Sequence, residues 1–430
     1  MFFKKHVFII LCVLVFLIPK AYYVYSAYKT NHYTKEKVYN SGDETHYLKI
    51  GKNLSKHWVY SDNDSNIPTE HATWRPPIWP FVLALFYVIT HNIFGLILLK
   101  ALLELGVILG ALLLFKKHFK YSFFQLAPFL VLLLEPQYIK YSITFLSESI
   151  TACLLLVLTV FFIVYAQRKK FSTLIIVCSA LVVLCHPVSV FFVGALLLFY
   201  GLINIRKHTI QVLFHSILFI VLMAIWPIRN SETFDKGLYL TASQGAVLSK
   251  GWNKNVINNF NNVDGDLANE ALNLTDFPSE QIDLENLSIL DRNLMYKEST
   301  IKFIASIDLN EKLALMFTKV KANFNPLPML KKDTFLDRIA IPFRIFYLFI
   351  FAQALYLLMF KGKSGLKEEI FHSCLVVLAI IIGQGIMSIY AYTGLRFNSI
   401  YGLALLFMGI LINLDFLNKQ LSTLLIKINQ

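Results

Sequence analysis

The sequence predicts an all-helical, polytopic integral membrane protein with about ten transmembrane helices, in a range of roughly nine to twelve. Three observations support this fold class. Hydrophobic residues make up 56% of the 430 positions and charged residues only 16%, whereas about 25% are charged in soluble domains. Apolar runs of about 20 residues, the length that crosses the hydrocarbon core, recur along the chain. Lys and Arg gather in alternate short loops, as they do in proteins that cross a membrane repeatedly.

The first apolar run follows Lys4 and Lys5 and resembles a signal peptide. The bulky stretch "PKAYYVYSAY" comes next instead of a small-residue cleavage site, so we expect a retained first span. Ten runs are candidate spans: 7–26, 95–115, 122–139, 143–166, 171–185, 187–204, 210–228, 341–360, 369–391 and 398–418. The shorter run 78–91 follows "RPPIWP" and is better explained as a half-span or interfacial helix.

Charge distribution sets the expected orientation. With both termini in the cytoplasm, the basic clusters "KKHFK", "QRKK" and "NIRKH" all face inside. The net charge of +13 therefore indicates membrane topology, and we expect no nucleic-acid partner. This orientation predicts three parts. The first is an N-terminal transmembrane module, 1–228, which includes an outer loop at 28–77. A mostly helical outer segment at 229–340 comes next, and C-terminal transmembrane helices at 341–430 complete the chain.

An acidic pair, Asp43 and Glu44, lies just outside the first span in "GDETHYLKIGKNLSKHW". Apolar positions from Tyr47 onward have helical spacing, which predicts a juxtamembrane helix with Asp43 at its N-cap. Capping alone would explain both acids. A catalytic role needs supporting groups from elsewhere, and Arg75 in "TWRPPIWP" is one candidate, either for a phosphate or for lipid headgroups.

Other ionisable residues are expected near the same outer boundary. Glu148, in "YSITFLSESI", lies at the start of a span, where a carboxylate is costly unless it faces a polar cavity. Arg229 follows the span at 210–228, and Arg396 lies at the start of the span at 398–418, both on the expected outer side. Glu104 lies four residues after Lys100, and we interpret it as a structural ion pair.

These carboxylates and cations would suit a reaction in which a hydroxyl attacks and a phosphate leaves. The chain contains no Walker loop and no GxGxxG motif. The activated group is therefore expected to arrive on a lipid.

Several motifs together resemble the GT-C-type membrane glycosyltransferases, a superfamily that includes protein O-mannosyltransferases and the aminoarabinose transferase of lipid A. The resemblance rests on the acidic pair with Tyr47, on "RPPIWPFVLALFY", on "YSITFLSESI", on "WPIRNSETFDKGLYLTASQGAVLSKGWN" and on "TGLRFNSIYGLALLFMGI". The chain departs from the pattern where "CHP" replaces Arg-Pro, where a Trp after Pro is missing, and where the late proline is missing.

The resemblance implies transfer of a sugar from a polyprenyl-phosphate donor to an acceptor hydroxyl on the outer face, with inversion. It implies that Asp43 is the general base and that the carboxylates of Glu44 and Glu148 also belong to the catalytic site. Its implied substrate-binding residues are Tyr47, Arg75, His186, Arg229 and Arg396. The sequence identifies no cofactor and leaves a divalent cation open, for which Asp43 and Glu148 would supply oxygen ligands.

The acceptor can be a lipid, a glycan or a protein, and the expected location is the bacterial inner (plasma) membrane. Two other functions stay open. A transporter or flippase for lipid-linked saccharide would favour inverted repeats and charges at the bilayer midplane. A polysaccharide polymerase would share the large outer loops.

Overall fold

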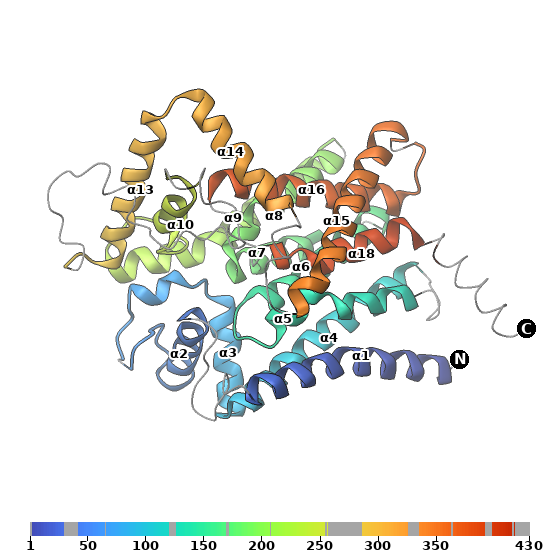
Figure 1. Ribbon diagram of the computed structural model, residues 1–430, viewed down its shortest axis with the longest axis horizontal. Coiled ribbons are helices and arrows are strands. Elements are labelled where there is room, and N and C mark those ends of the chain that lie inside the picture. Colours follow the sequence, from blue (N-terminus) through green and yellow to red (C-terminus); the bar gives the residue numbers. More distant parts are fainter. Residues whose placement is uncertain are drawn as a thin grey trace, which may run out of the picture.

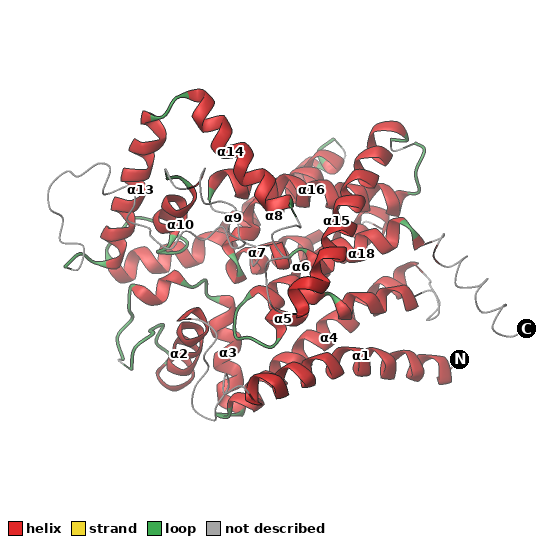
Figure 2. Cartoon of the chain, viewed as in Figure 1, coloured by secondary structure: helices red, strands yellow, loops and turns green. Residues whose placement is uncertain are grey.

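The computed structural model describes residues 2–29, 42–64, 66–119, 126–168, 172–206, 208–253, 256, 286–325, 335–362, 364–391, 398–414 and 417. Within these ranges the regular elements are helices, and no strand occurs (Figure 2). The N-terminal half contains α1 (Phe2–Lys29), α2 (Gly42–His57), η1 (His71–Trp74), α3 (Ile78–Ile89), α4 (Ile93–Phe119), η2 (Ala127–Leu134), α5 (Pro136–Ser142), α6 (Glu148–Arg168) and α7 (Ser172–Cys185). The remainder contains η3 (Pro187–Ser189), α8 (Val190–Asn204), α9 (Thr209–Phe234), α10 (Gln244–Gly251), α13 (Ile289–Ser306), α14 (Leu309–Phe324), α15 (Phe335–Phe360), α16 (Glu368–Tyr390) and α18 (Gly402–Ile412).

The prediction of an all-helical fold is confirmed for the described residues, and their apolar helices fit a polytopic membrane protein. Among the described residues, six helices are long and apolar enough to span a bilayer: Ile93–His118, Glu148–Tyr165, Pro187–Asn204, Thr209–Phe234, Arg338–Phe360 and Glu368–Tyr390. Four further apolar helices are shorter, and α3 is one of them, as expected for a half-span. The total of about ten crossings stays a prediction.

The structure differs from the predicted span at 122–139. Its described part consists of the 3₁₀ helix η2 and the short helix α5, which meet at Glu135 and Pro136. Proline favours the first turn of a helix and disrupts an interior, so the chain breaks here and restarts. The side chain of Glu135 caps the new helix by accepting a hydrogen bond from the Tyr138 backbone N–H. After α5, a turn over 143–147 leads into α6.

Helix α6 forms the centre of the bundle, in contact with α4, α7, α16 and α18. Its apolar side chains are buried, whereas α9 carries a run of exposed ones on the outside of the bundle: Ile210, Leu213, Phe214, Ile217, Ile220, Val221 and Ile225. An exposed apolar face of this length fits a lipid environment, where such side chains need no protein cover.

The outer loop and the outer segment meet at one end of the molecule. This end contains α2, α3, α10 and α13, and the opposite end contains the start of α1 and the end of α18 (Figure 1). α2 packs so closely on α3 that a Cβ added to Gly51 would lie only 2.7 Å from the Cβ of Leu83. The described part of the outer segment contains the helices α10, α13 and α14, in agreement with the predicted helical character of this segment.

A buried ion cluster joins α1 to α4 inside the bundle. Glu104 lies 2.6 Å from the Nζ of Lys20 and 3.7 Å from the Nζ of Lys100, and it also accepts a 2.9 Å hydrogen bond from Tyr138 Oη. The predicted pairing of Glu104 with Lys100 is confirmed, but Lys20 is the closer partner. Lys100 in turn donates to the carbonyl oxygens of Tyr141 (3.0 Å) and Thr144, and so holds the turn that precedes α6.

Candidate active site

A cavity of about 460 Å³ opens at the end of the molecule where α2 and α10 lie (Figure 1). Its charged and titratable wall residues are Asp43, Arg75, His186 and Lys250. They come from α2, from the link between η1 and α3, from the residue before η3, and from α10. Apolar side chains complete the wall, among them Val188, Val190, Phe191, Met387 and Tyr390. The volume falls within the range of small-molecule sites.

Asp43 and Arg75 form an ion pair on this wall. The guanidinium Nη2 of Arg75 donates to Asp43 Oδ1, and the two side chains are 15% and 32% exposed. α2 begins at Gly42, so Asp43 lies in the first turn and not at the predicted N-cap. A carboxylate in this position interacts favourably with the positive end of the helix dipole.

Tyr47 extends the same wall one helical turn further. The guanidinium carbon of Arg75 lies 5.3 Å from the centre of the Tyr47 ring, and Tyr47 Oη lies 3.2 Å from Ser147 Oγ. This hydroxyl contact ties α2 to the turn before α6. The structure thus brings together four of the predicted site residues, namely Asp43, Tyr47, Arg75 and His186.

Glu44 points away from the cavity into the protein. It is fully buried and accepts a 2.8 Å hydrogen bond from the backbone N–H of Phe145. Phe145 also accepts a 2.6 Å bond at its carbonyl oxygen from the indole of Trp79 in α3. Glu44 therefore joins α2 to the 143–147 turn. Its neighbour Asp43 faces the cavity because adjacent residues on a helix point in different directions.

Glu148 lies behind the cavity wall. It is buried at the first residue of α6, and its Oε1 lies 3.7 Å from Nε2 of His186. His186 lines the cavity, whereas Glu148 does not. The oxygen ligands that the sequence suggests for a divalent cation, Asp43 and Glu148, have different partners, because Asp43 is paired with Arg75 and Glu148 contacts His186.

Arg229 lies outside the cavity wall. Its guanidinium is 5.0 Å from the ring of Trp226 and 5.5 Å from that of Tyr60, and it donates a 3.0 Å bond to Asn230. Such cation–π contacts stabilise an aromatic cluster. Arg396 lies outside the described residues, so its predicted role stays a prediction.

Lys250 and Trp74 are among the wall residues that were not predicted from the sequence. Lys250 lies near the end of the quoted stretch "WPIRNSETFDKGLYLTASQGAVLSKGWN" but was not singled out there. It reaches the cavity because α10 is fixed against α13, where Asn293 Oδ1 accepts hydrogen bonds from the N–H groups of Gly245 (2.7 Å) and Ala246 (3.1 Å). Trp74 also lines the cavity.

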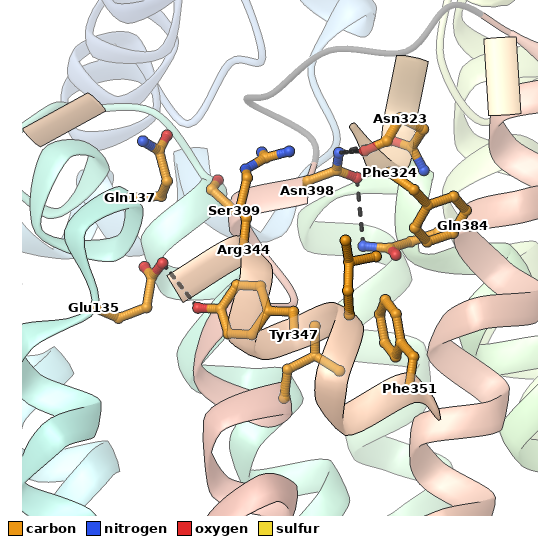
Figure 3. A pocket seen from close by; sticks show the side chains of 12 residues that line it. Glu135, Gln137, Asn323, Phe324, Arg344, Tyr347, Phe351, Gln384, Asn398 and Ser399 are labelled. Atoms are coloured by element: carbon orange, nitrogen blue, oxygen red, sulfur yellow. Dashed lines mark hydrogen bonds between the residues drawn. The ribbon is translucent and has the colours of Figure 1, made fainter. Parts of the chain in front are cut away.

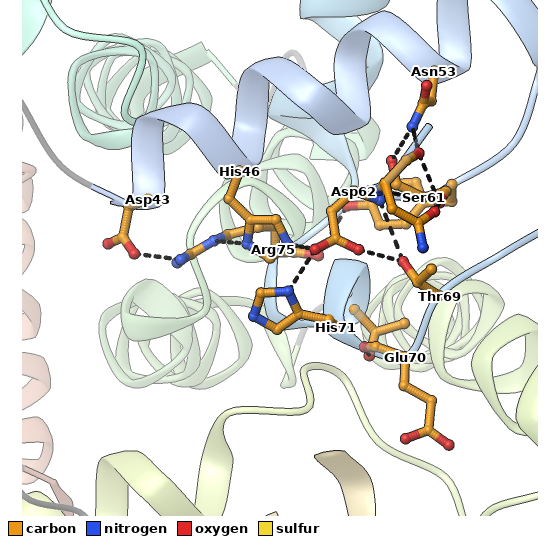
Figure 4. Close-up of polar contacts among 12 residues, drawn as sticks. Asp43, His46, Asn53, Ser61, Asp62, Thr69, Glu70, His71 and Arg75 are labelled. Carbon is orange, nitrogen blue, oxygen red and sulfur yellow. Dashed lines mark hydrogen bonds and ion pairs between the residues drawn. The ribbon is translucent and has the colours of Figure 1, made fainter. Parts of the chain in front are cut away.

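A second polar group adjoins this site in the outer loop (Figure 4). His46, Asp62 and His71 bring their ligand atoms within 4.8 Å of one another, as metal-binding side chains do. Burial opposes ionisation of Asp62, but hydrogen bonds from His46, His71 and Thr69 outweigh it and hold the pKa of this carboxyl well below its usual range. Burial lowers the pKa of His46, so the neutral imidazole is favoured.

A smaller polar pocket lies deeper, between α5, α15 and α16 (Figure 3). Tyr347 donates a 3.0 Å bond to Glu135 there, and Asn398 bonds to Asn323 at 2.6 Å. Its volume of about 40 Å³ is close to that of a single water molecule. It is therefore too small for a sugar.

Comparison of the chain with protein-family models, with curated proteins and with solved structures finds no match.

Proposed function

We propose that this protein is a membrane glycosyltransferase of the GT-C type, which moves a sugar from a polyprenyl-phosphate donor to an acceptor hydroxyl at the outer face. The observation that carries the proposal is the cavity that combines Asp43 with the cations Arg75 and Lys250. Its remaining wall is largely apolar, which suits a substrate delivered from the lipid phase.

Asp43 would act as the general base. Its carboxylate takes the proton of the acceptor hydroxyl while that oxygen attacks the anomeric carbon of the sugar. The bond from this carbon to the phosphate oxygen breaks, and the lipid phosphate leaves with the electron pair. A single displacement of this kind inverts the anomeric configuration.

Arg75 and Lys250 would stabilise the leaving phosphate. A guanidinium carries five N–H donors, and the described contacts of Arg75 use one for His46 and one for Asp43. The others can contact phosphate oxygens. A phosphate that draws Arg75 toward itself weakens its hold on Asp43. Donor binding would therefore increase the basicity of the carboxylate at the moment when it is needed.

The remaining parts of the proposal follow from the topology. With about ten crossings and both termini in the cytoplasm, the cavity would lie on the outer face of the membrane, and we propose that this is a bacterial inner membrane. The acceptor would be a lipid, a glycan or a protein that approaches from the outer side.

The test uses the purified full chain in lipid nanodiscs with a panel of radiolabelled polyprenyl-phosphate sugars and candidate acceptors. We expect release of polyprenyl phosphate coupled to sugar transfer. Asp43→Asn should lower the rate about 10²–10⁴-fold, because the amide cannot accept the proton.

Asp64→Asn is the matched control, since Asp64 is an exposed carboxylate in the same outer loop. It should leave the rate unchanged. Transfer by Asp43→Asn at the wild-type rate would refute the base assignment. In vesicles, movement of intact donor across the bilayer without cleavage would refute the transferase proposal in favour of a flippase.

A further inference from the structure

The contacts of His46 form a continuous chain from Asp62 to the cavity. Nε2 of His46 lies 3.2 Å from Asp62 Oδ2, and Nδ1 of the same ring accepts a 3.0 Å hydrogen bond from Nε of Arg75. Arg75 continues the chain to Asp43. His46 is buried, at 6% exposed, so water does not replace either contact freely.

The Arg75 contact determines which tautomer His46 adopts. The Nε of an arginine always carries a proton, so His46 Nδ1 must accept and cannot carry one. A neutral imidazole then bears its proton on Nε2, the nitrogen that faces Asp62 Oδ2 at 3.2 Å. Asp62 is itself held by Thr69 Oγ1 at 2.5 Å and by His71 Nδ1 at 2.5 Å.

The same geometry argues against a metal ion at His46, Asp62 and His71. A histidine that binds a metal through Nε2 normally donates its Nδ1–H to an acceptor, but here Nδ1 faces the N–H of Arg75. Two ligand atoms around a tetrahedral zinc would also lie about 3.3 Å apart, given metal–ligand distances of about 2.0 Å. His71 and Asp62 are closer than this and are hydrogen-bonded directly.

We infer that Asp62 and His46 are positioning residues, which fix the Arg75 guanidinium toward the phosphate site of the proposed transferase. Asp62 lies against the Nε2 edge of His46 and holds the ring in place, and Nδ1 of His46 presents an acceptor that restrains rotation of the guanidinium. A second contact fixes the backbone, because Tyr60 Oη donates to the carbonyl oxygen of Arg75 at 2.9 Å. The inference rests on the proposed function for its catalytic consequence, but its structural part can be tested without activity.

The first experiment measures the tautomer. Full-length protein labelled with ¹⁵N-histidine is reconstituted in lipid bilayers and examined by solid-state NMR at neutral pH, and His46 is assigned by comparison with His46→Gln. We expect the neutral Nε2–H tautomer, unchanged by one equivalent of Zn²⁺. A protonated Nδ1 would overturn the inference. A zinc-induced shift of the His46 and His71 nitrogens would overturn it in favour of a metal site.

The second experiment uses two substitutions that preserve different halves of the ring's hydrogen bonding. The amide oxygen of Asn can occupy the place of Nδ1 and keep the Arg75 contact, whereas the amide of Gln reaches the place of Nε2 and keeps only the Asp62 contact. We expect His46→Gln to lower kcat/KM for donor about 10–100-fold. His46→Asn should lower it less than about fivefold.

Loss of buried packing alone would not favour Asn over Gln, so equal losses in the two variants would contradict the positioning role. In an Arg75→Ala background, neither substitution should change kcat/KM by more than about twofold, because their effect passes through Arg75. His57→Gln is the control, since His57 is an exposed residue at the end of α2, and it should leave kcat/KM unchanged. Should the wild-type protein transfer no sugar, the NMR result still decides the structural inference while the proposed function fails.

Discussion

Replacing Glu104 by Gln tests whether the ion cluster between α1 and α4 stabilises the bundle. Glu104 is fully buried between Lys20 and Lys100, which are 5% and 1% exposed. Gln has nearly the same shape as Glu but no charge. The variant therefore leaves two buried ammonium groups close together without a carboxylate between them.

The expected cost follows from the desolvation of these charges. Removing one partner of a buried ion pair costs about 3–5 kcal/mol, since the other charge stays out of water. With an unfolding entropy of about 2.1 cal/mol/K per residue, the 430 residues give about 0.9 kcal/mol/K. The midpoint of thermal unfolding should consequently fall by about 3–6 °C.

The assay is thermal unfolding of the purified protein in one detergent, followed by intrinsic tryptophan fluorescence. Lys20→Met is the matched control, because it leaves one ammonium and one carboxylate in the cluster and should cost less. Adding Lys20→Met to Glu104→Gln should raise the midpoint again, since only one unpaired cation then remains. A wild-type midpoint for Glu104→Gln, or a double variant less stable than both single ones, would refute the reasoning.

Two further predictions concern the outer loop. Because burial, as the largest cause, lowers the pKa of His46 from 6.5, the unfolded chain binds a proton between about pH 6.5 and pH 5 that the folded chain does not. The free energy of unfolding should therefore fall as the pH falls through this window. The unfolding midpoint of His46→Gln should not change with pH in the same window. An equally steep fall in His46→Gln would assign the effect to another group. Glu44→Ala leaves the buried N–H of Phe145 without its acceptor and should lower the free energy of unfolding by about 1–3 kcal/mol. Glu44→Gln keeps an acceptor oxygen and should lower it less. Denaturant unfolding of both variants measures the difference. Equal losses in the two Glu44 variants would show that the charge matters and not the hydrogen bond.

The fold class was predictable because it depends on local properties of the chain. Span length and hydropathy are read from consecutive residues, and α4, α9 and α16 correspond closely to predicted runs. Local composition could not predict the break at Glu135 and Pro136, where a single apolar run becomes two short helices. Hydropathy averages over such a run and does not respond to the one residue at which the helix restarts.

The candidate site was predictable only in part. Asp43 and Arg75 are exceptional in a mostly apolar chain, so composition and spacing singled them out. Lys250 looked like any other charged residue of an outer segment. It reaches the cavity only because α13 fixes α10, a contact between segments about 50 residues apart in the chain.

The sequence by itself determined that this is a helical membrane protein, that an acidic pair follows its first span, and that an arginine precedes the apolar run at 78–91. Those properties follow from hydrophobicity, charge and spacing along the chain. Only the tertiary structure decided that Asp43 faces the cavity while Glu44 is buried, and that His46 joins Asp62 to Arg75. Each of these distinctions depends on which helix face meets which neighbour, and that is fixed by packing between residues far apart in the sequence.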